Sequence, residues 1–338
     1  MIGPSLVAEM GSGGATEPGP LRVAILDDWQ EAVLASADWS RLEGVATVEV
    51  VPSISGLEAL AQALAGFDVI VAMRERTAFP AQLLERLPRL RLLVTTGSVN
   101  AAIDLAACAR LGVTVCGTTS VAGVTAEYAW ALLMAAAKRL DLELPATRQG
   151  AWQVGRGDQL PVRLRGRTLG VVGLGRVGSQ VADYGRAFGM MVSGHDPHLE
   201  EERWAELGLE PIGLDQLLAQ SDFVTLHLGL SSATVGLVGP AQLALMKPTA
   251  WLINTSRGPI VDRSALIEAC AQGWIAGAAL DVYDQEPLPV DDELRRVPNI
   301  IVSPHLGYVA QEQWRLWHAD TVEDILAFQA GRPLRRLA

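Results

Sequence analysis

Three glycines lie between an apolar run at residues 168–172 and a helical pattern that extends to about residue 188. The segment is Gly173-Leu174-Gly175-Arg176-Val177-Gly178. With this spacing the first glycine permits a tight turn, the second lets a pyrophosphate approach the backbone, and the third lets helix and strand pack closely. The start of the helix adds N–H groups and a partial positive charge. These six residues are therefore predicted to bind the phosphates of a dinucleotide.

An acidic residue, Asp196, ends the next predicted strand, eighteen residues after Gly178. A carboxylate at this place accepts hydrogen bonds from the ribose hydroxyls and repels a 2′-phosphate. The sequence therefore predicts NAD as the cofactor in preference to NADP. His195 and His198 flank Asp196 and would weaken the discrimination if protonated. The alternative for Asp196 is a turn residue before Pro197.

Three further segments follow the glycine motif in a fixed order. They are Ile253-Asn254-Thr255-Ser256-Arg257-Gly258, Leu280-Asp281-Val282-Tyr283-Asp284-Gln285-Glu286-Pro287 and Val302-Ser303-Pro304-His305-Leu306-Gly307. Together with the glycine motif they closely resemble the D-isomer-specific 2-hydroxyacid dehydrogenase family, over about residues 21–335. The resemblance implies an oxidoreductase that transfers hydride between NAD(H) and a small D-2-hydroxy acid/2-keto acid pair.

The resemblance implies that Arg257, Glu286 and His305 are the catalytic residues. The planar arginine fork binds a carboxylate at two points and polarises a carbonyl. Histidine donates a proton when charged and accepts one when neutral, and a neighbouring carboxylate favours the charged ring. Without the motifs, these residues would be a surface arginine, a loop acid and a Pro-His turn.

Two more residues in these segments are expected to contact the cofactor. Thr255 precedes the arginine, and Asp281 matches a family acid that supports the nicotinamide and the arginine. A hydrogen-bonding role at a strand end is the alternative for Asp281. Formate dehydrogenases of this fold carry glutamine at the position of Glu286, so the glutamate indicates carbonyl chemistry coupled to proton transfer.

Residues 95–104 resemble the family's substrate loop, in which the backbone N–H groups of Ser98 and Val99 would bind the substrate carboxylate. The sequence departs from the family pattern, which has glycine in place of Val99 and Asp-Asn in place of Ala101-Ala102. The nature of the substrate beyond its keto-acid group therefore stays open. Asp104 is better explained as a helix cap.

Other polar and aromatic residues have weaker signals. Arg74 and Arg76 could recognise a second acidic group of the substrate, but solvated loop cations are the favoured interpretation. Tyr308, Trp314 and Trp317 follow His305 and could line the pocket, but aromatic residues on a helix more often belong to a core.

Apolar runs alternate with helical patterns from about residue 21 onward. Strands are predicted at 22–26, 47–51, 69–73, 92–95 and 113–116, and again at 168–172, 190–193, 223–226, 251–254, 278–281 and 300–302. Helices are predicted at 57–64, 81–87, 103–111, 125–140 and 311–330. We therefore predict an α/β protein of two doubly wound parallel-sheet domains, a Rossmann-type cofactor domain and a flavodoxin-like substrate domain, with the active site in the cleft between them.

The predicted boundaries follow from the restart of the alternation. Residues 1–20 should be a flexible tail, residues 21–119 and 309–338 the discontinuous substrate domain, and residues 120–308 the NAD-binding domain. The stretch from about 140 to 167 is polar and predicted to be irregular, and the basic residues at 332–336 are predicted to form a solvated end. The helix at 125–140 is apolar on more than one face, and the resemblance places it in a homodimer interface.

Composition excludes several classes of function. A net charge of −11 argues against nucleic-acid binding and against docking on an anionic membrane. The longest apolar stretch, residues 129–137, is too short to span a bilayer. Three cysteines without CxxC spacing predict no metal site and a reducing, cytoplasmic environment. Two rivals remain open: an NAD(H)-sensing protein similar to transcriptional corepressors, and a phosphite dehydrogenase.

Overall fold

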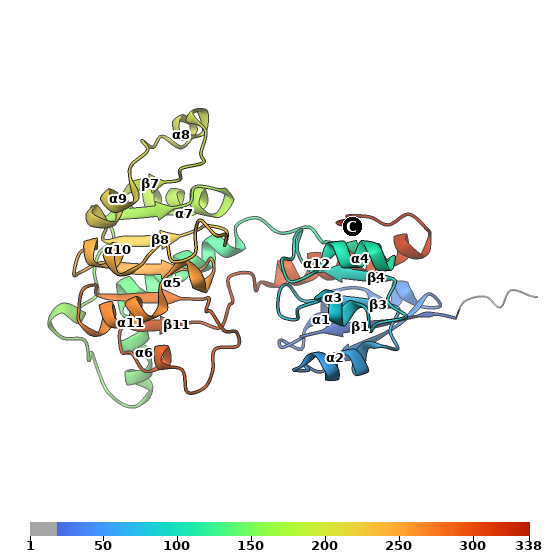
Figure 1. The fold of residues 1–338 in the computed structure, drawn as a ribbon. Helices are drawn as coiled ribbons and strands as arrows, with labels where there is room; N and C mark the ends of the chain where they lie inside the picture. Colours follow the sequence, from blue (N-terminus) through green and yellow to red (C-terminus); the bar gives the residue numbers. More distant parts are fainter. Residues whose placement is uncertain (1–18) are drawn as a thin grey trace, which may run out of the picture. The chain divides into compact units, whose positions relative to one another are not determined.

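The computed structural model describes residues 19–338, except the side chain of Asp158. Residues 1–18 of the predicted tail lie outside this range. The chain divides into two units: the described residues up to Ser120 together with Trp314–Ala338 form the first unit, and Val121–Gln313 form the second. Each unit is built on its own parallel sheet, which confirms the predicted α/β class (Figure 1).

The first unit has five strands in the order β2-β1-β3-β4-β5. The strands are β1 Leu21–Leu26, β2 Ala46–Val51, β3 Val69–Ala72, β4 Leu92–Thr95 and β5 Thr114–Cys116. The helices are α1 Val33–Ser36, α2 Leu57–Leu64, α3 Ala81–Leu84, α4 Leu105–Leu111 and α12 Gln311–Gln329, with a 3-10 helix at Trp39–Leu42. Because the order reverses at β1, right-handed crossovers place α1 on one face and α2 to α4 on the other. This is the predicted flavodoxin-like order.

The end of the chain forms part of this unit, so the prediction of a solvated basic end was wrong for Arg335. Its guanidinium forms ion pairs with three acidic residues of α12, including the fully buried Asp324 at 3.1 Å. The residues after it hydrogen-bond to the edge of β5, where Leu337 donates its N–H to the Val115 carbonyl at 2.7 Å. The run of basic residues did not predict these ion pairs, because they form only when the chain folds back on α12.

The second unit has six strands in the order β11-β10-β9-β8-β6-β7. They are β6 Thr168–Val172, β7 Met191–His195, β8 Phe223–Leu226, β9 Trp251–Asn254, β10 Gly277–Leu280 and β11 Ile300–Val302. A single parallel bridge between Gly194 and Pro211 lies beyond β7. With that bridge counted as a strand, the order is that of a Rossmann sheet, which reverses between β6 and β8. Ligands of such sheets bind at the carboxyl ends of the strands at this reversal.

Helices cover both faces of the second sheet (Figure 1). They are α5 Val124–Lys138, α6 Leu140–Arg148, α7 Arg176–Ala187, α8 Glu201–Leu207, α9 Leu214–Gln220, α10 Pro240–Leu245 and α11 Arg263–Ala271, with 3-10 helices at Gly157–Gln159, Gly258–Ile260 and Glu293–Arg295. Alternate strand residues enter two separate cores. Leu252 packs with α9, α10 and α11, whereas Ile253 packs with α5 and α7. This explains why the strands are continuously apolar.

The segment after α5 corrects one prediction, because α6 forms where an irregular stretch was expected. Arg139 takes a positive φ of 51° and separates α5 from α6. No residue of α6 is buried, and Pro145 lies within it. A helix without a buried face leaves no apolar periodicity in the sequence.

Candidate active site

The glycine turn joins β6 to α7 in the second unit. Gly173 has a φ of +88°, and a Cβ there would lie 2.6 Å from the His227 carbonyl oxygen. A Cβ on Gly178 would overlap the Gly173 carbonyl. At Gly175, by contrast, an added Cβ would meet nothing within 4 Å. The turn therefore needs Gly173 and Gly178 for its own packing and has open space above Gly175, which suits an approaching pyrophosphate.

Two polar side chains extend this cradle. Asp196 lies just after β7, and its carboxylate accepts the N–H of Leu174 at 2.9 Å and that of His198 at 3.1 Å. The bond from Leu174 holds the acid beside the glycine turn. Thr255, after β9, is buried, and its hydroxyl has no hydrogen-bond partner within residues 19–338. A buried hydroxyl without a partner is expected to bind a ligand or water, so this end of the sheet fits a dinucleotide.

Arg257 stands in the loop after β9, and neighbouring residues fix that loop. The Asn254 amide donates to the Arg257 carbonyl at 3.0 Å and accepts the Ser256 N–H at 3.0 Å. The Ser256 hydroxyl donates to the Leu226 carbonyl at 2.6 Å and accepts the Leu228 N–H at 3.1 Å. The loop is thus tied to the end of β8, and the Arg257 side chain donates from Nη1 to the Ser256 carbonyl at 2.8 Å.

His305 and Glu286 form a close pair. The His305 Nδ1 atom lies 2.5 Å from Glu286 Oε2, and Glu286 Oε1 accepts the Tyr283 N–H at 2.9 Å. Burial favours the neutral acid, but the hydrogen bond and charge of His305, the Tyr283 N–H and the charge of Arg257 outweigh it and lower the pKa of Glu286. The glutamate therefore stays ionised and orients the ring. Tyr308 meets the ring edge-on, with centroids 5.2 Å apart.

Asp281 follows β10 and is fully buried. Its carboxylate accepts the N–H groups of Leu306 at 2.8 Å and Gly307 at 2.7 Å, the two residues after His305. The structure therefore places Asp281 beneath the loop that carries the histidine. Burial raises the pKa of Asp281, and these hydrogen bonds oppose the rise.

The predicted substrate loop lies in the first unit, after β4. Gly97 takes the positive φ, at +94°, and exchanges hydrogen bonds with Thr118: its N–H donates to the Thr118 hydroxyl at 2.7 Å, and its carbonyl accepts the Thr118 N–H at 2.9 Å. The Ser98 and Val99 residues that follow are exposed. Buried Asn100 donates to the Arg74 carbonyl at 2.6 Å and accepts the Ala102 N–H at 2.9 Å. The loop is therefore held at both ends.

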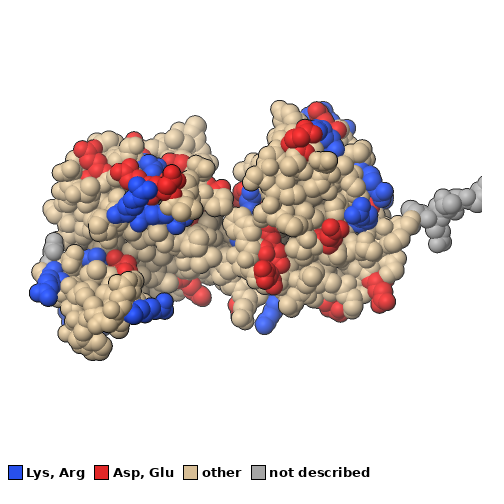
Figure 2. Space-filling view, turned by 90° about the horizontal axis from the view of Figure 1, so that it is seen from below, with Lys and Arg blue, Asp and Glu red and all other residues tan. Residues whose placement is uncertain are grey.

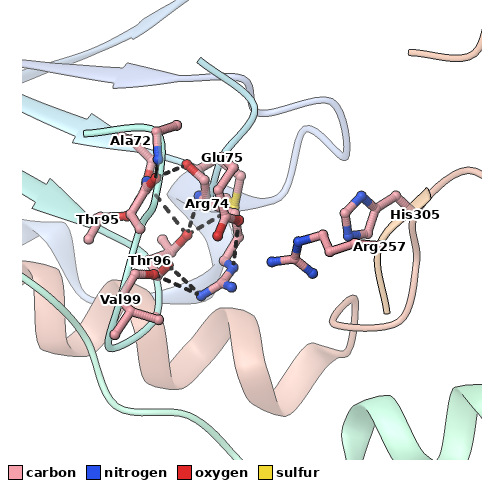
Figure 3. A network of polar contacts seen from close by, with 12 residues as sticks. Ala72, Arg74, Glu75, Thr95, Thr96, Val99, Arg257 and His305 are labelled. Atoms are coloured by element: carbon pink, nitrogen blue, oxygen red, sulfur yellow. Dashed lines mark hydrogen bonds and ion pairs between the residues drawn. The ribbon is translucent and has the colours of Figure 1, made fainter. Parts of the chain in front are cut away.

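Arg74 and Arg76 are not solvated cations, contrary to the favoured prediction. Arg74 donates to the carbonyls of Thr96 at 3.3 Å and Val99 at 3.5 Å, and Figure 3 shows its side chain directed at this loop. Arg76 lies over the Trp29 ring, 4.0 Å from its centre, and donates to the Asp27 carbonyl at 2.6 Å. Both arginines are half-buried, Arg74 against the loop after β4 and Arg76 against the segment after β1.

The structure brings Arg257, Glu286 and His305 together from three loops of the second unit, and Figure 3 shows Arg257 next to the His305 ring. Ser98 and Val99 belong to the first unit. The cap predicted for Asp104 is confirmed, since its carboxylate accepts the Ala107 N–H at 2.8 Å. Trp314 and Trp317 are buried, as predicted for core residues.

The surface carries charges of both signs. On the face shown in Figure 2, acidic and basic side chains lie side by side. Among the helices of residues 19–338, none combines the length and apolar character needed to cross a membrane.

Comparisons with known proteins identify the family of this chain. A family model described as the NAD binding domain of D-isomer specific 2-hydroxyacid dehydrogenases matches residues 130–307. The chain is 40% identical over 256 residues to a glyoxylate reductase of Aeropyrum pernix, covering 74% of this chain and 76% of that one. It is 34% identical over 299 residues to a D-3-phosphoglycerate dehydrogenase of Archaeoglobus fulgidus, covering 88% and 56% of the two chains.

Solved structures show the same architecture. A phosphoglycerate oxidoreductase from Vibrio cholerae superimposes with a TM-score of 0.87 at 34% identity, covering 92% of this chain and 99% of that one. A D-lactate dehydrogenase from Aquifex aeolicus, solved with NAD and lactic acid, gives a TM-score of 0.75 at 27% identity, covering 93% and 99%.

Proposed function

Because the chain belongs to the D-isomer specific 2-hydroxyacid dehydrogenase family and carries that family's NAD-binding domain, we propose that it interconverts a small D-2-hydroxy acid and its 2-keto acid. The observation that carries the proposal is the His305–Glu286 pair at 2.5 Å, with Arg257 close enough to lower the pKa of the glutamate. Arg257 binds and polarises the substrate, His305 is the acid and base, and Glu286 is its partner.

Reduction of a keto acid needs a hydride at the carbonyl carbon and a proton at its oxygen. Bound NADH supplies the hydride. The Arg257 guanidinium holds the carboxylate and draws charge toward the carbonyl oxygen as the C=O π electrons move onto it. His305 then donates the proton from Nε2, because Nδ1 faces Glu286. In the oxidative direction neutral Nε2 takes the proton back from the hydroxyl.

The cofactor contacts are assigned to the glycine turn, Asp196 and Thr255. The open space over Gly175 and the unpartnered Thr255 hydroxyl support this assignment. We propose that Asp196 makes NAD the preferred form, because its carboxylate repels a 2′-phosphate.

The substrate carboxylate is also assigned to the backbone N–H groups of Ser98 and Val99. The substrate class is a small keto acid, which is supported by the names of the relatives, glyoxylate reductase and D-3-phosphoglycerate dehydrogenase. Both act on acids with a functional group at the second carbon.

The test is NADH consumption with glyoxylate, hydroxypyruvate, pyruvate and branched or aromatic keto acids, with NADPH in parallel. Turnover with at least one acid, faster with NADH, is expected. His305→Gln should abolish it while leaving NADH binding intact. NADH binding without turnover of any acid would favour a sensing protein, and NAD reduction by phosphite alone would favour phosphite oxidation; either result would overturn the proposal.

We also propose a homodimer, on different grounds from those in the sequence. Six apolar residues of α5, among them Leu132 and Leu133, are buried within the second unit, and Trp130 and Met134 pack partly buried against the same core. Exposed apolar residues instead follow α5, with Leu144 at 56% and Trp152 at 79% exposure. Leu144 lines a hollow of about 390 Å³ together with other residues of α6 and Gln149. A second copy would cover this surface. Light scattering that returns a monomer at micromolar concentration would refute the dimer.

A cytoplasmic location is proposed as well. Cys108, Cys116 and Cys270 are free thiols, and burial raises the pKa of Cys108 to about 11 and of the other two to about 12. Buried, protonated thiols suit a reducing compartment.

A further inference from the structure

A chain of hydrogen bonds runs from α5 to the loop that carries His305. The Tyr128 hydroxyl lies 2.5 Å from Ser303 Oγ, and Ser303 Oγ donates to Asp281 Oδ1 at 2.7 Å. Asp281 in turn accepts the N–H groups of Leu306 and Gly307. Ser303 and Asp281 are buried, and Tyr128 is half-buried. The chain therefore links a helix to the histidine loop through a protected path.

The chemistry of the groups fixes the direction of the two bonds that lead from Tyr128 to Asp281. An ionised carboxylate can only accept hydrogen bonds. The single Ser303 proton must therefore go to Asp281, and Tyr128 must donate to Ser303 Oγ. Burial raises the pKa of Tyr128, so its phenol stays protonated and remains a donor. Hydrogen bonds aligned in one direction polarise and strengthen one another.

The loop that carries His305, where this series of hydrogen bonds ends, needs this support. His305 has a positive φ of 54°, a conformation unusual for a residue with a side chain. The two N–H groups that Asp281 accepts follow it directly. A Cβ on Gly307 would lie 3.0 Å from Asp281 Oδ2, so the loop backbone approaches the carboxylate closely. The position of the histidine therefore depends on the position and charge of Asp281.

We propose that Tyr128 and Ser303 are positioning residues for the reaction: they hold Asp281 ionised and in place, and Asp281 fixes the loop that presents His305. This role rests on the proposed function. It also differs from the cofactor contact expected for Asp281, because its three acceptor bonds within the second unit all go to Ser303 and the histidine loop.

The proposal predicts a specific pH dependence of keto-acid reduction. The titratable groups that face Asp281 among the described residues are Tyr128 from α5, Tyr283 from the loop after β10, and His305. Burial raises the pKa of Asp281, and the Ser303 hydrogen bond, the two N–H groups and the charge of His305 oppose the rise. Weakening the Ser303 bond lets Asp281 take up a proton at higher pH. A neutral Asp281 then loses one loop N–H.

The pH effect can be separated from the titration of His305. Reduction requires a charged His305, so the histidine alone causes a loss of rate on the alkaline side. Protonation of Asp281 causes a loss on the acid side. The acid limb of keto-acid reduction should therefore move to higher pH when the chain is cut, whereas the alkaline limb keeps its origin.

The experiment is the pH profile of keto-acid reduction in Tyr128→Phe, which removes one hydroxyl and keeps the ring. We expect kcat on the acid side to fall by about threefold to tenfold, the range for one hydrogen bond, with little change in the KM of the keto acid. In Ser303→Ala, kcat on the acid side should fall further. In Ser303→Thr, which keeps the hydroxyl, kcat should return toward the wild-type value. Tyr184→Phe is the matched control, because Tyr184 on α7 contacts Trp130 and lies outside the chain.

Two readouts separate the possible failures. An unchanged profile in Tyr128→Phe and Ser303→Ala, with an active wild type, would overturn the positioning role and leave the proposed function intact. If the wild type reduces no keto acid, the proposed function fails by itself. The His305 Cε1 proton in the NMR spectrum, assigned with His305→Gln, then reports on the loop without substrate. It should shift in Tyr128→Phe and stay in place in Tyr184→Phe; equal spectra would overturn the role of the chain.

Discussion

The loop that carries His305 in the second unit and the loop after β4 in the first unit are held by charged side chains of opposite sign, whereas asparagine amides both donate and accept in each unit. In the second unit, side-chain acceptors collect backbone N–H groups: Asp281 accepts two, Glu286 accepts one and Asn254 accepts one. In the first unit, the Arg74 side chain instead donates to backbone carbonyls, as does the Asn100 amide.

This difference explains why the sequence predicts the site of the second unit better than the loop of the first. The acceptors of the second unit stand within the same short segments as the residues proposed for catalysis, so motif and support are adjacent in the chain. Arg74 comes from the loop after β3 and acts on the loop after β4, 22 residues away. The local sequence therefore predicts the reaction class, but it does not predict the geometry of the loop that we propose binds the substrate.

The largest effect is expected from Arg257→Lys, which tests whether Arg257 of the second unit is the cation that binds the substrate. Lysine keeps the charge but loses the two-point fork. Losing one donor to a developing oxyanion costs about 2.7–4 kcal/mol, or roughly a hundredfold or more in kcat/KM. NADH affinity by fluorescence titration should stay nearly normal, because the glycine turn and Asp196 are untouched. Arg263→Lys, in an ion pair with Asp292 at 2.9 Å, is the control; near-normal turnover in Arg257→Lys would make Arg257 structural.

Glu286→Gln should have the next largest effect, on the pH profile. The pKa of Glu286 is lowered, so the carboxylate is charged throughout the neutral range and favours the charged His305 ring. Glutamine removes that charge, so the alkaline limit of keto-acid reduction should move to lower pH. A shift of one pH unit lowers the rate by about tenfold on the alkaline limb. An alkaline limit at the wild-type pH would exclude Glu286 as the partner of the histidine.

The fold was more predictable than the contacts that position the site. Strands such as β3 and β8 are buried along their whole length, so continuous apolar runs revealed them. The α6 helix buries nothing and was missed. Asp196 and the residues proposed for catalysis lie in motifs. Tyr128 and Ser303 are 175 residues apart, and nothing in either segment predicts their contact. Arg335 was misread for the same reason, because its partners lie on a helix that starts more than twenty residues earlier.

Arg74→Met tests the first unit in the same way, with a smaller expected effect. Removing the guanidinium leaves the Thr96 and Val99 carbonyls without a charged donor, and such bonds contribute about 1.5–3 kcal/mol. We expect the KM of the keto acid to rise by about tenfold while NADH affinity is unchanged. Arg110→Met is the control, because Arg110 is exposed and its ion pair with Glu85, at a distance of 3.8 Å, is a weak surface pair. An unaltered KM would mean that the loop keeps its shape without Arg74.

The smallest effect on catalysis is expected from His318→Gln, which changes stability and leaves the reaction alone. His318 lies on α12, is fully buried, and has its Nδ1 atom 2.6 Å from the Ser36 hydroxyl. Burial lowers its pKa to about 4 from the usual 6.5, although the charge of Asp28 and a Trp314 backbone contact oppose the shift. The folded protein therefore binds fewer protons at this site than the unfolded chain does. The stabilisation from the neutral ring is complete above pH 6.5 and is lost as the pH falls toward 4, and its full size is on the order of 3 kcal/mol.

Glutamine cannot titrate, so the urea midpoint of the variant should fall less between pH 7 and pH 5 than that of the wild type. His198→Gln, at an exposed site of the second unit, should keep the wild-type slope. The pH profile of keto-acid reduction should be the same in all three proteins, because that profile depends on His305, Glu286 and Asp281. A changed profile in His318→Gln would show that acid stability in the first unit and proton transfer in the second are coupled.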